Sequence, residues 1–275
     1  MNIIDDINRK GYTIIKNVLS INECEEVRAK TNELIKNERF VTADKAFEED
    51  VFIDSIFNHK IVSAMKEIMK EEPVYLIPDI QIHKNIFLKG AWHTDSDTEV
   101  KYGYLNNKDY KFYKVGIYTQ ENNEKNDGSI NVMSGSHKCI NAKSFSLKRI
   151  FYKLKIKFIN KFKILDDYLS TKVNINAGDA IIFDSRLAHA GSISNVFKKN
   201  SVNKDKITIY FNFSNEDYSQ RYLLNSYYRL RYGKDKKGDK SYMFQTEASY
   251  PKSYNENVIK NCEQNNIAIQ SFRNL

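Results

Sequence analysis

The sequence lacks the residues that mark several common classes of protein. Its three cysteines, Cys24, Cys139 and Cys262, lie far apart and form no CxxC pair, which argues against a disulfide framework or a zinc site. With only three prolines and ten glycines in 275 residues, the chain is not linker-rich or of low complexity. The N-terminus carries Asp5 and Asp6, unlike a signal peptide, and no stretch approaches the roughly 20 apolar residues of a membrane-spanning helix. We therefore expect a cytoplasmic protein.

The residues that are abundant favour a folded core and an excess of positive charge. Hydrophobic residues make up 41% of the chain, including 18 tyrosines and 16 phenylalanines, which is enough for a core. The net charge is +8, which raises the question of nucleic acid, anionic membranes or acidic small molecules as partners. Lysine and asparagine are scattered throughout, and no nucleic-acid recognition motif accompanies them, so we expect no nucleic-acid partner.

The order of sequence patterns predicts helices first and many short strands afterwards. Gly11–Ile15 is typical of a strand, and Ser20 with Glu23 forms a capping box that opens a helix reaching about Asn37. Residues 57–70 predict a second helix. The predicted strands after it are 74–77, 80–88, 114–119, 129–133, 173–176, 180–183 and 207–213. This order favours a mainly β fold with flanking helices, a β-sandwich or jelly roll.

Two separate stretches carry the residue types of a metal site. In Trp92-His93-Thr94-Asp95, the histidine and the carboxylate are two residues apart, so on a strand both point to the same face. His189 lies almost a hundred residues later, in the stretch 187–192. Two imidazoles and one carboxylate are the ligand set of non-haem Fe(II) enzymes. A jelly roll places early and late strands side by side, so His93, Asp95 and His189 could meet.

Residues 11–20, 92–95, 126–138 and 178–192 form four ordered blocks that resemble the phytanoyl-CoA dioxygenase family of Fe(II)/2-oxoglutarate-dependent oxygenases. The resemblance implies a double-stranded β-helix core, a cupin-like jelly roll. It also implies Fe(II), with 2-oxoglutarate and dioxygen as co-substrates, and hydroxylation as the usual outcome. By position, His93, Asp95 and His189 would be the metal ligands. Related halogenases have a small residue in place of this carboxylate, so Asp95 argues against halogenation.

The residue that would bind the far carboxylate of 2-oxoglutarate departs from the family pattern. The family usually has an arginine there, at the start of the strand after the second histidine. Here Lys206 precedes that strand. Lysine can pair with a carboxylate, but it cannot form the bidentate hydrogen bonds of an arginine guanidinium. We predict that Lys206 takes this role, with Lys204 and Arg221 as alternatives. The further polar candidates for contact with 2-oxoglutarate are Gln81, Thr119 and Ser192.

Residues 143–165 predict a basic amphipathic helix inserted among the strands. Between Lys143 and Lys163 there are eight lysines or arginines and no acid. The apolar residues recur at three- and four-residue steps, at Leu147, Ile150, Phe151, Leu154, Phe158, Phe162 and Leu165. The helix could pack this apolar face on the core, form a wall against an anionic substrate, or attach to an anionic membrane surface. We expect one domain over residues 1–275, with this insert and a C-terminal extension from about 218.

The leading functional hypothesis is a 2-oxoglutarate-dependent dioxygenase, a hydroxylase. Its substrate would be a small-molecule or carrier-linked metabolite of glycan, lipid or secondary metabolism. One alternative is a catalytically silent jelly-roll binding module, which the lysine at 206 keeps open. The other is a peripheral membrane protein that acts through the basic helix at 143–165.

Overall fold

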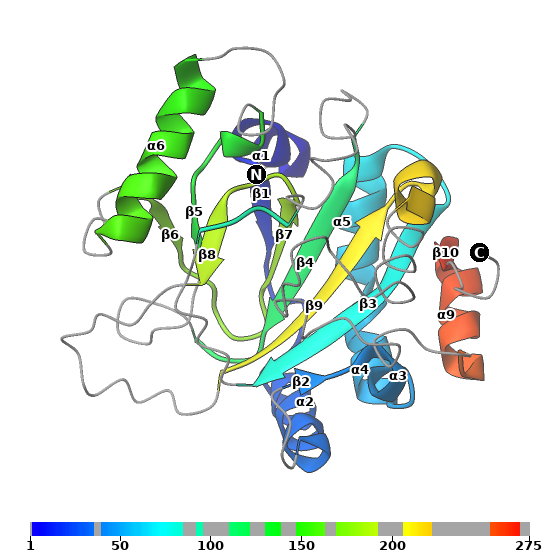
Figure 1. Ribbon diagram of the computed structural model, residues 1–275. Coiled ribbons are helices and arrows are strands. Elements are labelled where there is room, and N and C mark those ends of the chain that lie inside the picture. The colour runs from blue at the N-terminus through cyan, green and yellow to red at the C-terminus, as the bar shows by residue number, and fades with distance from the viewer. Residues whose placement is uncertain are drawn as a thin grey trace, which may run out of the picture.

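Two facing sheets form the centre of the molecule, and helices cover the outside of the larger one (Figure 1). The computed structural model describes residues 2–35, 40–84, 92–95, 110–121, 130–138, 147–162, 169–191, 206–221 and 254–269. Among the helices in these ranges, none combines the length and the apolar character needed to cross a membrane.

The N-terminal third is mostly helical. Its elements are α1 (Ile3–Lys10), β1 (Tyr12–Ile15), α2 (Ile21–Leu34), β2 (Phe40–Val41), α3 (Ala43–Ala46), α4 (Asp50–Ile56) and α5 (His59–Met69). The predicted strand and both predicted helices are confirmed as β1, α2 and α5. The capping box is present, because Ser20 Oγ accepts from the Glu23 amide at 3.2 Å and the Glu23 carboxylate accepts from the Ser20 amide at 2.6 Å. The short helices α1, α3 and α4 were not predicted.

The larger sheet has the order β1-β7-β4-β9-β3-β10, with β2 added beside β3. Its later strands are β3 (Val74–Lys84), β4 (Phe112–Tyr118), β7 (Ala180–Asp184), β9 (Ile207–Ser214) and β10 (Ile267–Ile269), the last following α9 (Glu256–Asn265). Its pairs are antiparallel except that β10 runs parallel to β3. The strand predicted at 74–77 and the described part of the one predicted at 80–88 are one strand, with an irregularity between Ile77 and Gln81, while residues 85–88 lie outside the described ranges.

The smaller sheet has the order β6-β5-β8, formed by β5 (Ile130–Val132), β6 (Thr171–Val173) and β8 (His189–Gly191). A short 3₁₀ turn, η3 (Ser136–Lys138), follows β5. Apolar side chains from both sheets share one buried cluster, in which Tyr118 and Phe183 of the larger sheet meet Val132 and Val173 of the smaller one. The other face of the larger sheet packs on the N-terminal helices. This arrangement confirms the predicted jelly roll with flanking helices.

Strand alternation sorts the residues of β4 and β9 between two environments. Val115, Ile117, Ile209 and Phe211 belong to the core under the helices. The intervening positions, Lys114, Gly116, Tyr118, Thr208 and Tyr210, therefore face the space between the sheets. At Gly116, an added Cβ would lie 2.8 Å from Tyr210 Cε1, so only glycine allows the Tyr210 ring to lie across β4.

The predicted basic helix is α6 (Leu147–Lys161), outside the smaller sheet at the left of Figure 1. Residues 143–146 and 163–165 lie outside the described ranges. The helix contacts the core through Tyr152, Ile156 and Ile159, which pack near Trp92. The apolar residues expected to face the core are exposed instead at all six described positions between Leu147 and Phe162, so the first interpretation of this helix is wrong. The physical reason is a second, narrower apolar stripe on the opposite side of the helix, which makes the contact.

Candidate metal centre

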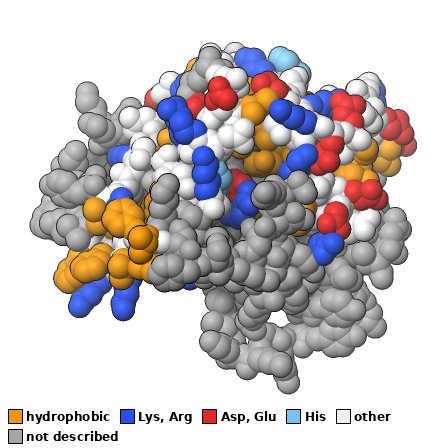
Figure 2. Space-filling view, turned by 90° about the horizontal axis from the view of Figure 1, so that it is seen from above, with side chains coloured by type: hydrophobic (Ala, Val, Ile, Leu, Met, Phe, Trp, Pro, Cys, Tyr) orange, Lys and Arg blue, Asp and Glu red, His pale blue; other side chains and the backbone are white. Residues whose placement is uncertain are grey.

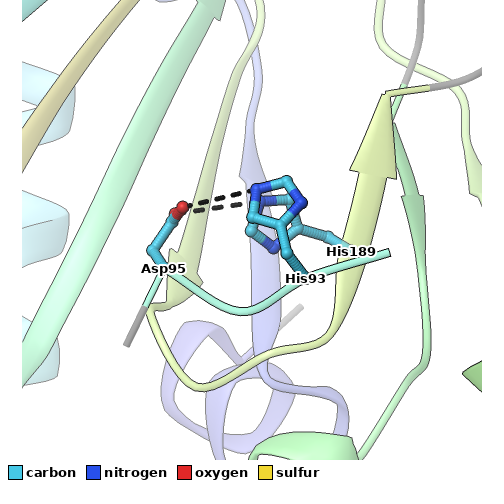
Figure 3. Close-up of side chains that lie close together, drawn as sticks. All are labelled: His93, Asp95 and His189. Carbon is cyan, nitrogen blue, oxygen red and sulfur yellow. Dashed lines mark ion pairs between the residues drawn. The ribbon is translucent and has the colours of Figure 1, made fainter. Parts of the chain in front are cut away.

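His93, Asp95 and His189 meet at one point beside β8 (Figure 3). The backbones of His93 and His189 pair directly, with N–H···O distances of 3.0 and 2.9 Å in the two directions. This bridge holds the two histidines together although they are far apart in the sequence. Each residue offers one ligand atom, and the three atoms lie within 4.8 Å of one another. The three side chains converge as the facial triad of non-haem iron enzymes requires.

The donor atoms at this point fit a divalent cation. Asp95 Oδ1 lies 3.6 Å from His93 Nε2, and Asp95 Oδ2 lies 3.7 Å from His189 Nε2, too far for hydrogen bonds. His189 Nδ1 lies 2.9 Å from the Leu187 carbonyl oxygen, which can only accept, so Nδ1 carries the hydrogen. Nε2 therefore presents a lone pair towards the carboxylate, as in most histidines that bind metals. Burial lowers the pKa of His189 to about 4, so its imidazole is neutral at pH 7.

Lys114 of β4 is the charged neighbour of this triad. Its Nζ lies 3.1 Å from Asp95 Oδ2. Burial raises the pKa of Asp95, but the Lys114 ammonium and the two imidazoles outweigh this and hold that pKa well below its usual range. Burial lowers the pKa of Lys114, and the Asp95 carboxylate outweighs it and raises that pKa. Both groups are therefore charged at neutral pH, and Lys114 orients the carboxylate.

The two histidines differ in their exposure to solvent. The His189 side chain is 8% exposed, and the edge-to-face contact with Phe183, at 4.9 Å between ring centres, supports it. The His93 side chain is 46% exposed. The described part of the site is therefore closed at His189 and open at His93, and the open side offers access to a substrate.

Lys206 lies at the other end of a chain of contacts that leads to the triad. Its Nζ is 5.6 Å from the centre of the Tyr118 ring. The Tyr118 and Tyr210 hydroxyls are 3.1 Å apart, and Lys114 Nζ is 5.8 Å from the centre of the Tyr210 ring. Burial lowers the pKa of Lys206 to about 8. A partly buried ammonium in this position is suited to an anionic ligand placed between it and the triad.

The other predicted contacts of 2-oxoglutarate have different surroundings. The Gln81 amide accepts from His83 Nε2 at 2.8 Å and donates to Asp79 at 3.3 Å, all on β3. The Thr119 hydroxyl donates to the Ile207 carbonyl at 3.1 Å and accepts from Arg28 of α2 at 3.3 Å. The remaining predicted candidates are Ser192 and Lys204, which lie outside the described residues, and Arg221, whose guanidinium donates to Asp217 at 2.8 Å.

Three site residues were missed in the sequence, namely Lys114, Tyr118 and Tyr210. The available signal was a lysine inside an otherwise apolar strand, two residues before the glycine at 116. Strand alternation then places Tyr118 on the same face as Lys114. His83 lies close as well, with its ring centre 5.2 Å from that of Tyr210. Burial lowers the pKa of His83 to about 3, and the charges of Lys114 and Lys206 add to the effect.

Comparisons with known proteins agree with this geometry. The sequence model of the phytanoyl-CoA dioxygenase (PhyH) family matches residues 7–195. Among curated proteins, no relative matches the chain in sequence.

Several solved structures share the fold at low sequence identity. The epimerase SnoN, solved with Fe3+, alpha-ketoglutarate and nogalamycin RO, matches with a TM-score of 0.54 at 14% identity, covering 78% of this chain and 82% of its own. HygX from Streptomyces hygroscopicus, solved with nickel and 2-oxoglutarate, also matches with a TM-score of 0.54 at 14% identity, covering 76% of this chain and 84% of its own. The non-heme monooxygenase ThoJ matches with a TM-score of 0.53 at 12% identity, covering 78% and 77%.

Proposed function

The chain belongs to the phytanoyl-CoA dioxygenase (PhyH) family, which makes it a 2-oxoglutarate-dependent oxygenase, and we propose that it hydroxylates a small-molecule or carrier-linked metabolite. The observation that carries the proposal is the convergence of one carboxylate and two imidazoles within 4.8 Å. The similar solved structures include proteins crystallised with iron or nickel and with 2-oxoglutarate, which supports the same reactants here.

His93, Asp95 and His189 would hold the iron. The Leu187 carbonyl fixes the His189 tautomer, and Lys114 fixes the Asp95 carboxylate, so two of the three ligands are oriented before the metal binds. When bound, Fe(II) with 2-oxoglutarate and dioxygen supplies the oxidation of a substrate C–H bond. Because Asp95 occupies the third ligand position, hydroxylation is favoured over halogenation.

Lys206 would receive the far carboxylate of 2-oxoglutarate. Its partly buried ammonium would stand in for the arginine that is usual in the family, and it lies against the Tyr118 ring, whose hydroxyl contacts that of Tyr210. Gln81, which lies opposite Tyr210 in the larger sheet, would be a further polar contact of 2-oxoglutarate. The Thr119 hydroxyl is engaged by Arg28 and the Ile207 carbonyl, so we give it a supporting role at the start of β9.

The first test is anaerobic titration of the protein with Fe(II) and 2-oxoglutarate. We expect a visible charge-transfer band that disappears in His93→Ala and persists in His59→Ala, a control on the distant helix α5. In air, we expect the wild type to convert 2-oxoglutarate into succinate. Iron binding without a band and without succinate would instead identify a silent binding module.

A further inference from the structure

Helix α6 carries two apolar faces, and only one is covered. The inner face holds Ile156 and Ile159 against the core, and the Tyr152 hydroxyl donates to the Ser134 carbonyl at 3.0 Å. The outer face is a stripe of six large side chains with exposures between 41% and 76%. These side chains are Leu147, Ile150, Phe151, Leu154, Phe158 and Phe162, and we call them the outer stripe. Their three- and four-residue spacing places them on one side of the helix.

Cations flank the outer stripe on both sides. With 3.6 residues per turn, Lys153, Lys157 and Lys161 fall along one side and Lys155 along the other. The ammonium of Lys155 lies 5.3 Å from the centre of the Phe151 ring, and that of Lys161 lies 5.2 Å from the centre of the Phe162 ring. No aspartate or glutamate occurs between residues 129 and 165. The stripe and its lysines are therefore purely apolar and cationic.

The space-filling view shows the same pattern on the surface. Hydrophobic side chains gather at one edge of the molecule, over α6, with lysines beside them (Figure 2). A contiguous exposed apolar patch rimmed by charged side chains is typical of an interaction site. The stripe itself offers no hydrogen-bonding group that would fix the orientation of a protein partner.

We propose that the outer stripe of α6 docks this protein on an anionic phospholipid surface. Phenylalanine and leucine side chains would enter the boundary between headgroups and acyl chains, while lysines on both sides would contact lipid phosphates. This complementarity of charge selects an anionic over a neutral bilayer. The attachment is peripheral, and it goes beyond the proposed oxygenase function and does not depend on it.

The inner face connects this surface to the metal centre. The Trp92 amide donates to Asn160 Oδ1 of α6 at 3.2 Å, and Trp92 directly precedes the predicted ligand His93. Ile159 shares a buried cluster with Trp92 and with Ala188, the neighbour of His189. Docking through α6 would therefore bring the metal centre close to the membrane surface.

The test is flotation of the full chain with lipid vesicles. We expect strong binding to vesicles of phosphatidylcholine with 30% phosphatidylglycerol, about tenfold weaker binding to pure phosphatidylcholine, and release of the bound protein in high salt. Leu154→Ser with Phe158→Ser should weaken binding at least tenfold. The matched control, Ile21→Ser with Ile259→Ser, removes two exposed apolar side chains elsewhere and should bind like the wild type.

A second pair of variants tests the charge. Lys153→Gln with Lys157→Gln should weaken binding to the anionic vesicles severalfold, whereas Lys70→Gln with Lys260→Gln, which removes the same charge from α5 and α9, should not. A midpoint temperature of thermal unfolding equal to that of the wild type establishes that each variant is folded. Equal binding to both vesicle types, no binding to either, or a dimer in gel filtration that Phe158→Ser dissociates would each overturn the proposal.

Discussion

Lys114 and Lys206 are both partly buried beside the space between the sheets, yet their surroundings shift their pKa values in opposite directions. The Asp95 carboxylate raises the pKa of Lys114, whereas burial lowers the pKa of Lys206 to about 8. Lys114 is thus the counter-ion of a protein group, and Lys206 is suited to a charge that a ligand brings. The comparison separates a lysine that pairs with a predicted metal ligand from a lysine whose proposed partner is the co-substrate.

The largest effect should come from removing the partner of Lys114. In Asp95→Ala, the triad loses its only carboxylate, so we expect loss of iron binding and a fall in turnover of about a thousandfold. The hydrogen bond between Lys114 and Asp95 is also lost. For this partly exposed pair, the loss should cost about 2 kcal/mol of stability. Metal analysis and thermal unfolding measure the two losses. Full iron content in this variant would contradict the assignment.

The second-largest effect should come from replacing Lys206. Because a charge-assisted hydrogen bond contributes about 1.5–3 kcal/mol, Lys206→Met should raise the KM for 2-oxoglutarate by about 10- to 100-fold. Lys206→Arg should keep it within a few-fold of the wild type. Iron content should be unchanged in both variants. Succinate formation at varied 2-oxoglutarate provides the measurement, and an unaltered KM in the methionine variant would move the role to another residue.

A smaller and different effect is expected for Lys114→Met. Residues that orient metal ligands typically change metal affinity or activity by about 10- to 100-fold when replaced, and we expect the lower end here. The KM for 2-oxoglutarate should stay nearly constant, because Lys206 is intact. Separate measurement of kcat and KM distinguishes the two lysines. If both variants raised the KM equally, the lysines would share one role.

The smallest effect is a dependence on pH. The folded-state pKa of Lys206 is about 8, below the ordinary value of 10.5, so the unfolded chain holds its proton to higher pH. Lys206 therefore destabilises the ligand-free protein below pH 8, and this cost disappears as the pH rises from about 8 to 10.5. Affinity for 2-oxoglutarate should fall severalfold through the same range, but not in Lys206→Arg. Isothermal titration at pH 7 and pH 9 is the check.

Much of the site could be predicted from the sequence because its signals are local. The spacing of His93 and Asp95 predicts that both side chains point the same way, and the order of strands allows His189 to join them. Residues 92–95 form an isolated bridge at His93 and a turn at Asp95 rather than the predicted strand. The first and fourth blocks of the resemblance also meet in the fold. Gly178 has a φ of 81° and an added Cβ would lie 2.0 Å from the Leu19 carbonyl oxygen, so the first and fourth blocks pack against each other there.

The rest depends on register and on tertiary contacts that no local pattern contains. Lys114 meets Asp95 only because β4 lies between β7 and β9, and Tyr210 crosses β4 only because residue 116 is glycine. Helix α6 shows the same limit, since periodicity reveals an apolar face but not what covers it. Short helices such as α3 are formed by packing more than by their own propensity, so they leave little signal.

The hydrogen bond between the Trp92 amide and Asn160 has a thermodynamic consequence. It links the helix at the surface directly to the segment that carries His93. Binding equilibria at two connected sites obey reciprocity, so any factor by which a lipid surface changes the affinity for 2-oxoglutarate is the factor by which 2-oxoglutarate changes the affinity for that surface. The supply of a soluble metabolite would then help set how much of this enzyme resides on the bilayer.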